Sequence, residues 1–482
     1  MDVLLVVPSS TQWDGEVSHG PERSYLDAML RGHGGINAIP FFPIEHIGLG
    51  FIASACINSG LSVGIINGIS GYHTSPEMTF DAIRRQGEKQ GPPCLVGFTG
   101  ADRFLFENLW LARQCKQLWP EVSVILGQEF ATLAHKRLLE SYPEFDYVCR
   151  GDGEKLVPEL VHRLRIGRRD GDGISGLSWR KPSGEIGMSA PEVVDLDTLA
   201  WPQRPDIHVA VLHGYGVAVS GSRGCPYRCA FCTSGNLHTE MSSIPRWRMR
   251  NINDLVDEIA FLCKDHGARR FLLTDEVFVV NSSPSHERAE MFARELLKRN
   301  LSIEFMFDCR VDGLDPDLFT LLYEAGLRQV FVGVETGNSR QLETFQKSYG
   351  SREDLVKRWK GVEQIGIKIT PGMILFHAEV SPEEIRDSLE LIESLQIKKL
   401  FSLLNRVNPI PGTALYEDYR RKGYLTYEWP IAEFRFQDPA MERLYNDLWE
   451  EYSKPGTTFE SLRETLHKKL IQIEAGAGAR NS

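Results

Sequence analysis

The sequence predicts an α/β protein with two successive halves and a helical C-terminal region. Short apolar runs alternate with amphipathic stretches from residue 1 to about 165, the pattern of a parallel, doubly wound sheet covered on both faces. A second alternation begins near Gly214 and runs to about residue 415. Between them, residues 166–210 are rich in Gly, Pro and charge, which favours a linker with a small hairpin. Residues 416–482 are polar and helical in pattern.

The composition is that of an ordinary globular protein, and the 482 residues suggest two or three domains. The formal net charge of −11 argues against a nucleic-acid partner, because phosphate binding needs a basic stripe. The apolar run near the N-terminus ends at Pro8, whereas a membrane helix needs about 20 apolar residues. Six of the nine cysteines lie singly in apolar surroundings, which is typical of reduced thiols. We therefore expect a cytoplasmic protein without a membrane partner.

In the first half, strands and helices can be placed by their apolar patterns. The predicted strands are residues 3–8, 61–68, 93–100, 121–128 and 145–154, and the predicted helices are 48–60, 106–119 and 132–143. Ligands of such sheets bind at the carboxyl ends of the strands. A dinucleotide-binding oxidoreductase is disfavoured, because no G-x-G-x-x-G follows the first strand.

The second half has a similar pattern. The predicted strands are residues 216–223, 268–276, 302–310, 329–336, 367–376 and 398–409, with helices such as 251–267 and 285–299 between them. About six consecutive right-handed βα units predict a full or partial barrel over residues 211–415. Its active face would lie at the carboxyl ends of the strands.

Directly after the first strand of this half stands RGCPYRCAFC, with Cys225, Cys229 and Cys232. Three thiolates on one short loop suit a soft metal centre. A structural zinc site would need a fourth ligand, for which the nearest candidates are His238 and Cys263. A 4Fe-4S cluster can instead take three cysteines and leave one iron open for another ligand.

The spacing of the three cysteines, with Phe231 before the third, resembles the radical SAM superfamily. Three further stretches carry this resemblance: LLTDEVF from Leu272, FDCRVDGL to GVETG from Phe307, and NPIPGTALYEDY from Asn408. The resemblance covers roughly residues 211–416. It implies a partial (βα)6 radical SAM barrel that binds a 4Fe-4S cluster and S-adenosylmethionine (SAM).

The resemblance also implies roles for individual residues. Asp275 or Glu276 would hold the amino group of SAM, and Arg310 and Glu335 would face the nucleoside. Phe231 would shape the adenine contact.

Two more residues have competing interpretations. Met373, at the end of the fifth strand, would line the same pocket or pack in the core. Tyr227, inside the cysteine loop, would lie near the substrate or pack as an ordinary loop aromatic. Cys309 fits a buried structural thiol better than a ligand.

The first half resembles the cobalamin-binding domain that precedes many radical SAM enzymes. The stretches that carry this resemblance are residues 44–60, 93–100, 123–140 and 145–160. The chain departs from the family at three places. The paired glycine reads Gly127-Gln128-Glu129, Asn67 replaces an acid, and Asp206-Ile207-His208 lacks the rest of a cobalt-ligating histidine motif.

Two functions follow from these resemblances. The first is cobalamin-dependent methyl transfer to a small polar metabolite of secondary metabolism, with a 5′-deoxyadenosyl radical abstracting hydrogen and flavodoxin or ferredoxin supplying the electron. The alternative is a non-methylating reaction, such as 1,2-diol dehydration of an aminoglycoside sugar, with a degenerate cobalamin domain. The Gln128 turn and the acidic chain motivate the alternative. A non-catalytic iron-sulfur sensor would not need the acidic pair, Glu335 and the PGT turn together.

Overall fold

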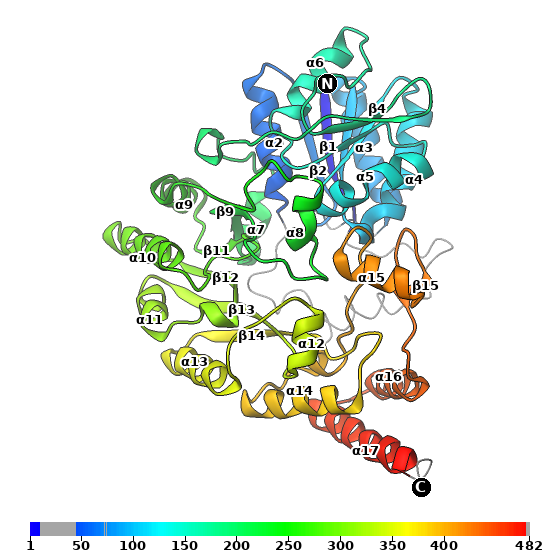
Figure 1. Ribbon diagram of the computed structural model, residues 1–482. Helices are drawn as coiled ribbons and strands as arrows, with labels where there is room; N and C mark the ends of the chain where they lie inside the picture. The colour runs from blue at the N-terminus through cyan, green and yellow to red at the C-terminus, as the bar shows by residue number, and fades with distance from the viewer. Residues whose placement is uncertain (10–44, 72, 74, 479–482) are drawn as a thin grey trace. The chain divides into compact units, whose positions relative to one another are not determined.

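The computed structural model describes residues 1–9, 45–71, 73 and 75–478. They divide into two compact units (Figure 1). The first unit holds residues 1–9, 45–226 and 233–274, and the second holds residues 227–232 and 275–478. This division falls inside the second strand-helix alternation, so the boundaries at residues 165, 210 and 415 stay predictions. Among the described residues, no helix combines the length and the apolar character needed to cross a membrane.

The first unit contains a seven-stranded sheet in the order β2-β1-β3-β4-β5-β6-β7. Its strands are β1 (Val3–Val7), β2 (Val63–Asn67), β3 (Leu95–Thr99), β4 (Ser123–Gly127), β5 (Tyr147–Cys149), β6 (Leu177–Arg180) and β7 (Ile186–Met188). The five predicted strands pair in parallel, which confirms the doubly wound sheet. The hairpin foreseen in the linker is β6–β7, and it extends the sheet by pairing antiparallel with β5.

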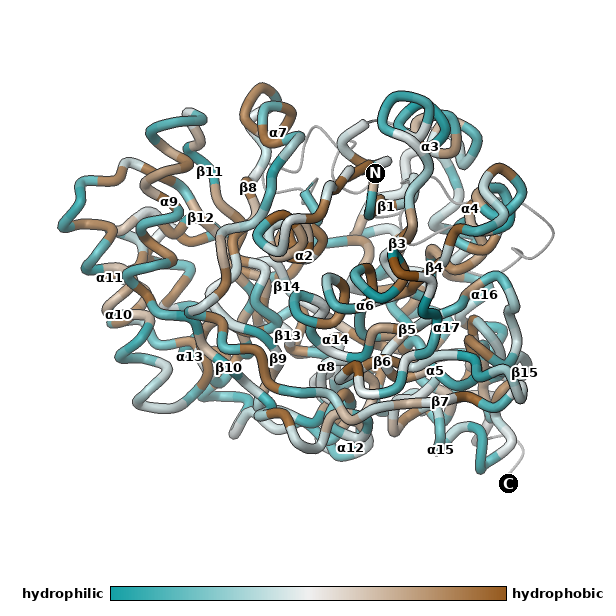
Figure 2. The backbone as a smooth tube through the Cα atoms, turned by 90° about the horizontal axis from the view of Figure 1, so that it is seen from above, coloured by the Kyte–Doolittle hydropathy of each residue, from teal (hydrophilic) through white to brown (hydrophobic). Residues whose placement is uncertain are grey.

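Helices cover this sheet because its central strands are apolar on both faces; every residue of β1 and β3 is buried. The helices are α2 (Ile47–Asn58), α3 (Pro76–Gln90), α4 (Leu105–Leu118), α5 (Glu129–Ser141) and α6 (Leu156–Arg165). The core joins Leu49 and Ala53 of α2 to Val3 and Leu5 of β1. Figure 2 shows the difference in hydropathy between α2, which is largely hydrophobic, and the outer helix α3.

The remaining elements of the first unit begin the second alternation. They are α7 (Ile207–His213), β8 (Val217–Val219), β9 (Ser222–Gly224), α8 (Thr233–Asn236), β10 (Trp247–Met249), α9 (Ile252–His266) and β11 (Arg270–Leu273). The single strand predicted over 216–223 is wrong. It is divided between β8, which pairs in parallel with β11, and β9, which turns away to pair antiparallel with β10. Gly221 separates them, and its carbonyl accepts a hydrogen bond from the Arg250 amide.

In the second unit, β12 (Glu304–Arg310), β13 (Leu327–Glu335) and β14 (Lys368–Met373) pair in parallel. Helices α10 (Ser283–Lys298), α11 (Pro316–Glu324), α13 (Arg352–Ile365) and α14 (Pro382–Ser394) lie outside these strands, and α12 (Ser339–Thr344) follows β13 (Figure 1). Aromatic rings hold the layers together. Phe292 of α10 meets Phe305 at 5.4 Å between ring centroids, and Phe307 meets Phe319 of α11 at 6.0 Å.

The sixth predicted strand, 398–409, is also wrong. A short 3-10 helix, η6 (Leu400–Leu403), occupies its start, and in place of a ladder the segment forms an isolated bridge between Phe376 and Arg406. Pro409 has no amide hydrogen and cannot extend a ladder.

The C-terminal region is mainly helical, as predicted. It contains α15 (Ala414–Lys422), α16 (Pro439–Tyr452) and α17 (Phe459–Gly478), with a small hairpin of β15 (Leu425–Tyr427) and β16 (Glu433–Phe434).

Candidate active site

The cysteine loop begins where β9 ends. Gly224 has φ +79°, and a Cβ built there would stand 2.1 Å from the Arg246 carbonyl oxygen, so glycine is required at this turn. None of Cys225, Cys229 and Cys232 forms a disulfide, and each is half-buried. No three or more His, Cys, Asp or Glu side chains among the described residues are already grouped as a metal site. The assignment of the three thiols as cluster ligands therefore stays a prediction.

Arg310 lies beside this loop at the end of β12. Its Nη1 donates to the Cys229 thiol at 3.7 Å, and its guanidinium lies 3.7 Å from the centroid of the Tyr227 ring. Arg310 is held by the Asp312 carboxylate at 3.0 Å and by the Ser348 carbonyl at 2.6 Å. Burial raises the pKa of the Cys229 thiol, while nearby Lys347 and Arg310 oppose that rise. The structure thus brings together Arg310, Tyr227 and one of the three predicted ligands.

Two basic side chains around the same loop are fixed by carboxylates in the first unit. Arg223, two residues before Cys225, donates to Asp152 at 2.8 Å and to Glu154 at 2.6 Å. Arg248 of β10 also donates to Asp152, at 2.5 Å. The RGDGE turn of the first half therefore anchors the β9–β10 hairpin from which the cysteine loop departs.

Glu335, at the end of β13, is held in a strained conformation with φ +67°. Its Oε1 lies 2.5 Å from the Lys347 ammonium, which also donates to the Gly333 carbonyl at 2.8 Å. Both side chains are buried, at 3% exposure for Lys347 and 10% for Glu335. Sequence reasoning missed Lys347, because the stretch FQKSYG carries no pattern that marks it.

The two acids after β11 have different environments. Asp275 is buried, and its Oδ1 lies 3.9 Å from Nη2 of Arg288, whereas Glu276 is exposed. Arg288 stacks on the Phe278 ring, with 4.9 Å to the centroid. Asp275 thus faces a cation inside the unit, and Glu276 is the more accessible of the two carboxylates.

Phe231 and its neighbour Ala230 connect the cysteine loop to the rest of the second unit through contacts with Phe345. Its ring makes an edge contact with Phe345 at 5.2 Å, and the neighbouring Ala230 amide donates to the Phe345 carbonyl at 2.9 Å. The Ala230 carbonyl accepts from Leu415, just after the PGT turn, at 2.9 Å. Met373 is only 1% exposed, which fits its alternative role in the core.

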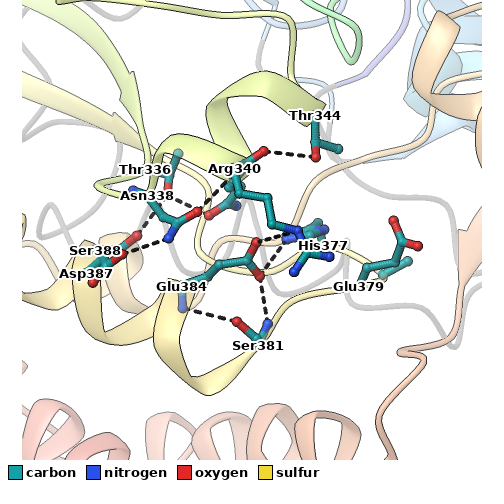
Figure 3. Close-up of polar contacts among 12 residues, drawn as sticks. Thr336, Asn338, Arg340, Thr344, His377, Glu379, Ser381, Glu384, Asp387 and Ser388 are labelled. Carbon is teal, nitrogen blue, oxygen red and sulfur yellow. Dashed lines mark hydrogen bonds and ion pairs between the residues drawn. The ribbon is translucent and has the colours of Figure 1, made fainter.

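The segments after β13 and β14 are fixed by a network of polar contacts (Figure 3). Thr336 and Ser388 share a hydrogen bond of 2.9 Å, and Asn338 donates to Asp387 at 2.7 Å. Nε2 of buried His377 lies 3.3 Å from Glu384, whose carboxylate also accepts from the Ser381 amide (Figure 3). This network holds the ends of both strands in place.

In the first unit, a pocket lies at the carboxyl ends of β1 and β2. Its lining includes Val7, Glu45, His46, Asn67, Arg204 and Asp206. Arg204 is paired with Glu45 at 2.9 Å and with Glu258 at 2.8 Å. The pocket thus lies at the carboxyl edge of the sheet, next to the switch point between β1 and β3 at which sheets of this order bind ligands.

The turn Gly127-Gln128-Glu129, where the family has a paired glycine, has a backbone conformation typical of glycine. Gln128 has φ 85° and ψ 175°, a region that only glycine adopts without strain. The Thr99 hydroxyl donates to the Gln128 side chain at 2.6 Å and also meets His46 at 3.2 Å. Glu129 accepts hydrogen bonds from the hydroxyls of Thr233 and Ser234. The backbone path at this strand end therefore survives the loss of glycine, although a side chain now covers it.

Comparison with known proteins identifies the second alternation. Residues 219–392 match the family described as the Radical SAM superfamily. This segment is a radical SAM domain. Enzymes of this superfamily use a 4Fe-4S cluster and SAM.

The similarity extends beyond that segment. An uncharacterized methyltransferase of Pyrococcus horikoshii is 25% identical over 402 residues, covering 82% of this chain and 83% of the relative.

Two solved structures share the fold. The cobalamin-dependent radical enzyme OxsB, with aqua-cobalamin and SAM bound, aligns with a TM-score of 0.71 at 17% identity, over 93% of this chain and 66% of its own. The methyltransferase TsrM of Kitasatospora setae, with cobalamin and a [4Fe-4S] cluster bound, aligns with a TM-score of 0.62 at 19% identity, over 82% of this chain and 71% of its own. This chain therefore spans about two thirds of OxsB. These alignments confirm the predicted fold class.

Proposed function

We propose that this radical SAM enzyme depends on cobalamin and transfers a methyl group to a carbon of a small polar metabolite in secondary metabolism. The observation that supports this most is the order of the two folds in one chain. A doubly wound sheet precedes the radical SAM segment, and the likeness to OxsB, which binds both cobalamin and SAM, runs over 93% of the chain. The relative from Pyrococcus horikoshii also bears the name of a methyltransferase.

In this proposal Cys225, Cys229 and Cys232 hold the cluster, since three soft thiolates in one loop are the donor set that leaves one iron open. When bound, the cluster and SAM supply a 5′-deoxyadenosyl radical and cobalamin supplies the methyl group. Two features of the first unit support cobalamin binding. The carboxyl ends of its parallel strands lie along one edge of the sheet, and Gln128 has the backbone conformation of glycine at the end of β4.

In this proposal the chain's own side chains bind and orient the cofactors and the substrate. Arg310 presents a fixed cation beside the cluster loop, suited to a carboxylate, because Asp312 and Ser348 restrain its guanidinium. Lys347 fixes the Glu335 carboxylate, and the Arg310–Tyr227 stack closes one side of the loop. A small-molecule substrate and an electron donor such as flavodoxin or ferredoxin complete the proposal.

The first test is metal analysis of protein purified without oxygen and supplied with iron, sulfide and hydroxocobalamin. We expect about four iron atoms and one cobalamin per chain, and a substrate that gains the mass of one methyl group. Replacing Cys225, Cys229 and Cys232 together by Ala should abolish iron binding. Cys94→Ala is the matched control, since Cys94 is half-buried but outside the loop. Iron retained by the triple variant would refute the ligand assignment.

A second candidate function is dehydration of a 1,2-diol in an amino sugar without cobalamin. The observation that favours it is the Gln128 side chain, which occupies the end of β4 and hydrogen-bonds to Thr99. Iron without cobalt in the loaded protein, together with loss of water from an amino-sugar diol, would establish this reaction and exclude methyl transfer.

A further inference from the structure

Among the described residues, helices pack on one face of the second-unit strands, and the other face carries an exposed side chain. Along β13, Val330, Val332 and Val334 are fully buried, whereas Phe331 between them is 36% exposed. Side chains alternate between the two faces of a strand. On β12, the odd-numbered Phe305 and Phe307 pack on helices, so Asp308 belongs to the other face.

The strand register places the residues of this open face in layers. Arg310 pairs with Gly333, and Gly333 pairs with Gly372. One layer deeper, Asp308 pairs with Phe331, and Phe331 pairs with Thr370. Two residues along a strand correspond to about 6.7 Å. The Asp308 layer therefore lies one step below Arg310, which contacts the cysteine loop.

Asp308 differs from the other carboxylates near this face. Asp275 faces Arg288, and Glu335 binds Lys347. The half-buried Asp308 carboxylate has no hydrogen bond or ion pair within the part of the chain that the structure describes. Burial and the nearby Asp275 charge raise its pKa to about 7. A cation placed next to such a carboxylate favours its ionised form.

Phe331 contributes an aromatic ring to the layer that contains Asp308. A Cβ on Gly372 would stand 2.7 Å from the Phe331 ring, so the ring lies over Gly372 and keeps its place only because that residue is glycine. A carboxylate beside an exposed aromatic ring is the combination that recognises ammonium groups, through charge and cation–π attraction.

We propose that Asp308 and Phe331 bind a protonated amine of the substrate, so that the substrate is an amino compound. This inference deepens the proposed function and rests on it, because a radical SAM domain acts on its substrate at the ends of these strands. A neutral polyol would donate a hydrogen bond to Asp308 but would gain no cation–π attraction from the ring. The amino group of SAM is a separate contact, expected near Asp275 or Glu276.

The test measures binding of paromamine, an amino sugar, to protein loaded with the cluster and SAM. Its fully N-acetylated derivative is the neutral comparison. We expect the free amine to bind at least about tenfold more tightly than the acetylated compound. Asp308→Asn should remove that preference, and Phe331→Leu should weaken amine binding about two- to fivefold. Glu324→Gln, an exposed carboxylate at the end of α11, is the control for general loss of charge.

Two results would overturn the inference. One is equal binding of the free and acetylated compounds to the unmodified protein, or no binding of either. The other is a loss of SAM affinity in Asp308→Asn that matches the loss of paromamine affinity, because the carboxylate would then serve SAM. The measurement requires neither cobalt nor methyl transfer, so its failure is distinct from a failure of the proposed reaction.

Discussion

The buried pair of Lys347 and Glu335 offers the sharpest test of how this active site is held. Lys347→Met keeps the aliphatic length of the side chain and removes the ammonium. Glu335 would then remain as a buried charge without the partner now 2.5 Å away. Breaking a buried ion pair by removing one partner costs about 3–5 kcal/mol. We expect the second unit to lose that much free energy of unfolding at pH 7.

The assay is hydrogen exchange of peptides from β13, measured in parallel with guanidinium unfolding. Lys398→Met, at an exposed position, is the matched control and should change stability little. The double variant Lys347→Met with Glu335→Gln should recover a large part of the loss, because a neutral amide no longer leaves an unpaired charge. A free energy of unfolding for Lys347→Met within about 1 kcal/mol of that of the unmodified protein would refute this reasoning, because the pair would then contribute no more than an exposed ion pair does.

Three further predictions follow from single contacts. Burial raises the pKa of Glu107 from 4.5 to about 7, although its carboxylate accepts two hydrogen bonds from Ser9. The folded state therefore binds more protons than the unfolded state between those values, and stability falls as pH rises through this window, by about 3 kcal/mol. In Glu107→Gln this decrease in stability with rising pH should be absent. Thermal unfolding of the variant and of the unmodified protein from pH 4.5 to 7.5 checks this, and the same pH dependence of stability in both would contradict it. Gly224→Ala should reduce iron content after reconstitution, because its methyl group meets the Arg246 carbonyl; unchanged iron would show that the loop accommodates it. Gln128→Gly should relieve about 1–3 kcal/mol of backbone strain and uncover the end of β4, so hydroxocobalamin should bind more tightly in an absorbance titration; weaker binding would show that the Gln128 side chain itself contacts the cofactor.

The sequence alone determined the fold class and most of its elements. Continuous apolar runs separated by helices indicate parallel strands covered by helices, and the cysteine spacing predicts a set of cluster ligands within one loop. The predictions of secondary structure failed where the local sequence pattern does not determine which strand a segment pairs with. Residues 216–223 divide into β8 and β9 because the second piece pairs with β10, which is distant in sequence. Residues 398–409 have the apolar pattern of a strand, but instead of a ladder they form a 3-10 helix and an isolated bridge at Arg406.

Only the tertiary structure decided which charges are already neutralised and which remain for a ligand. Lys347, Arg288 and Asp308 carry no distinguishing pattern in the sequence, and Asp275 and Glu276 look equivalent there. Folding places Arg288 against Asp275 and Lys347 against Glu335, while Asp308 stays without an ion-pair partner among the described residues. Electrostatic pairing depends on distances between residues far apart in the chain, and such distances exist only after the strands have found their register.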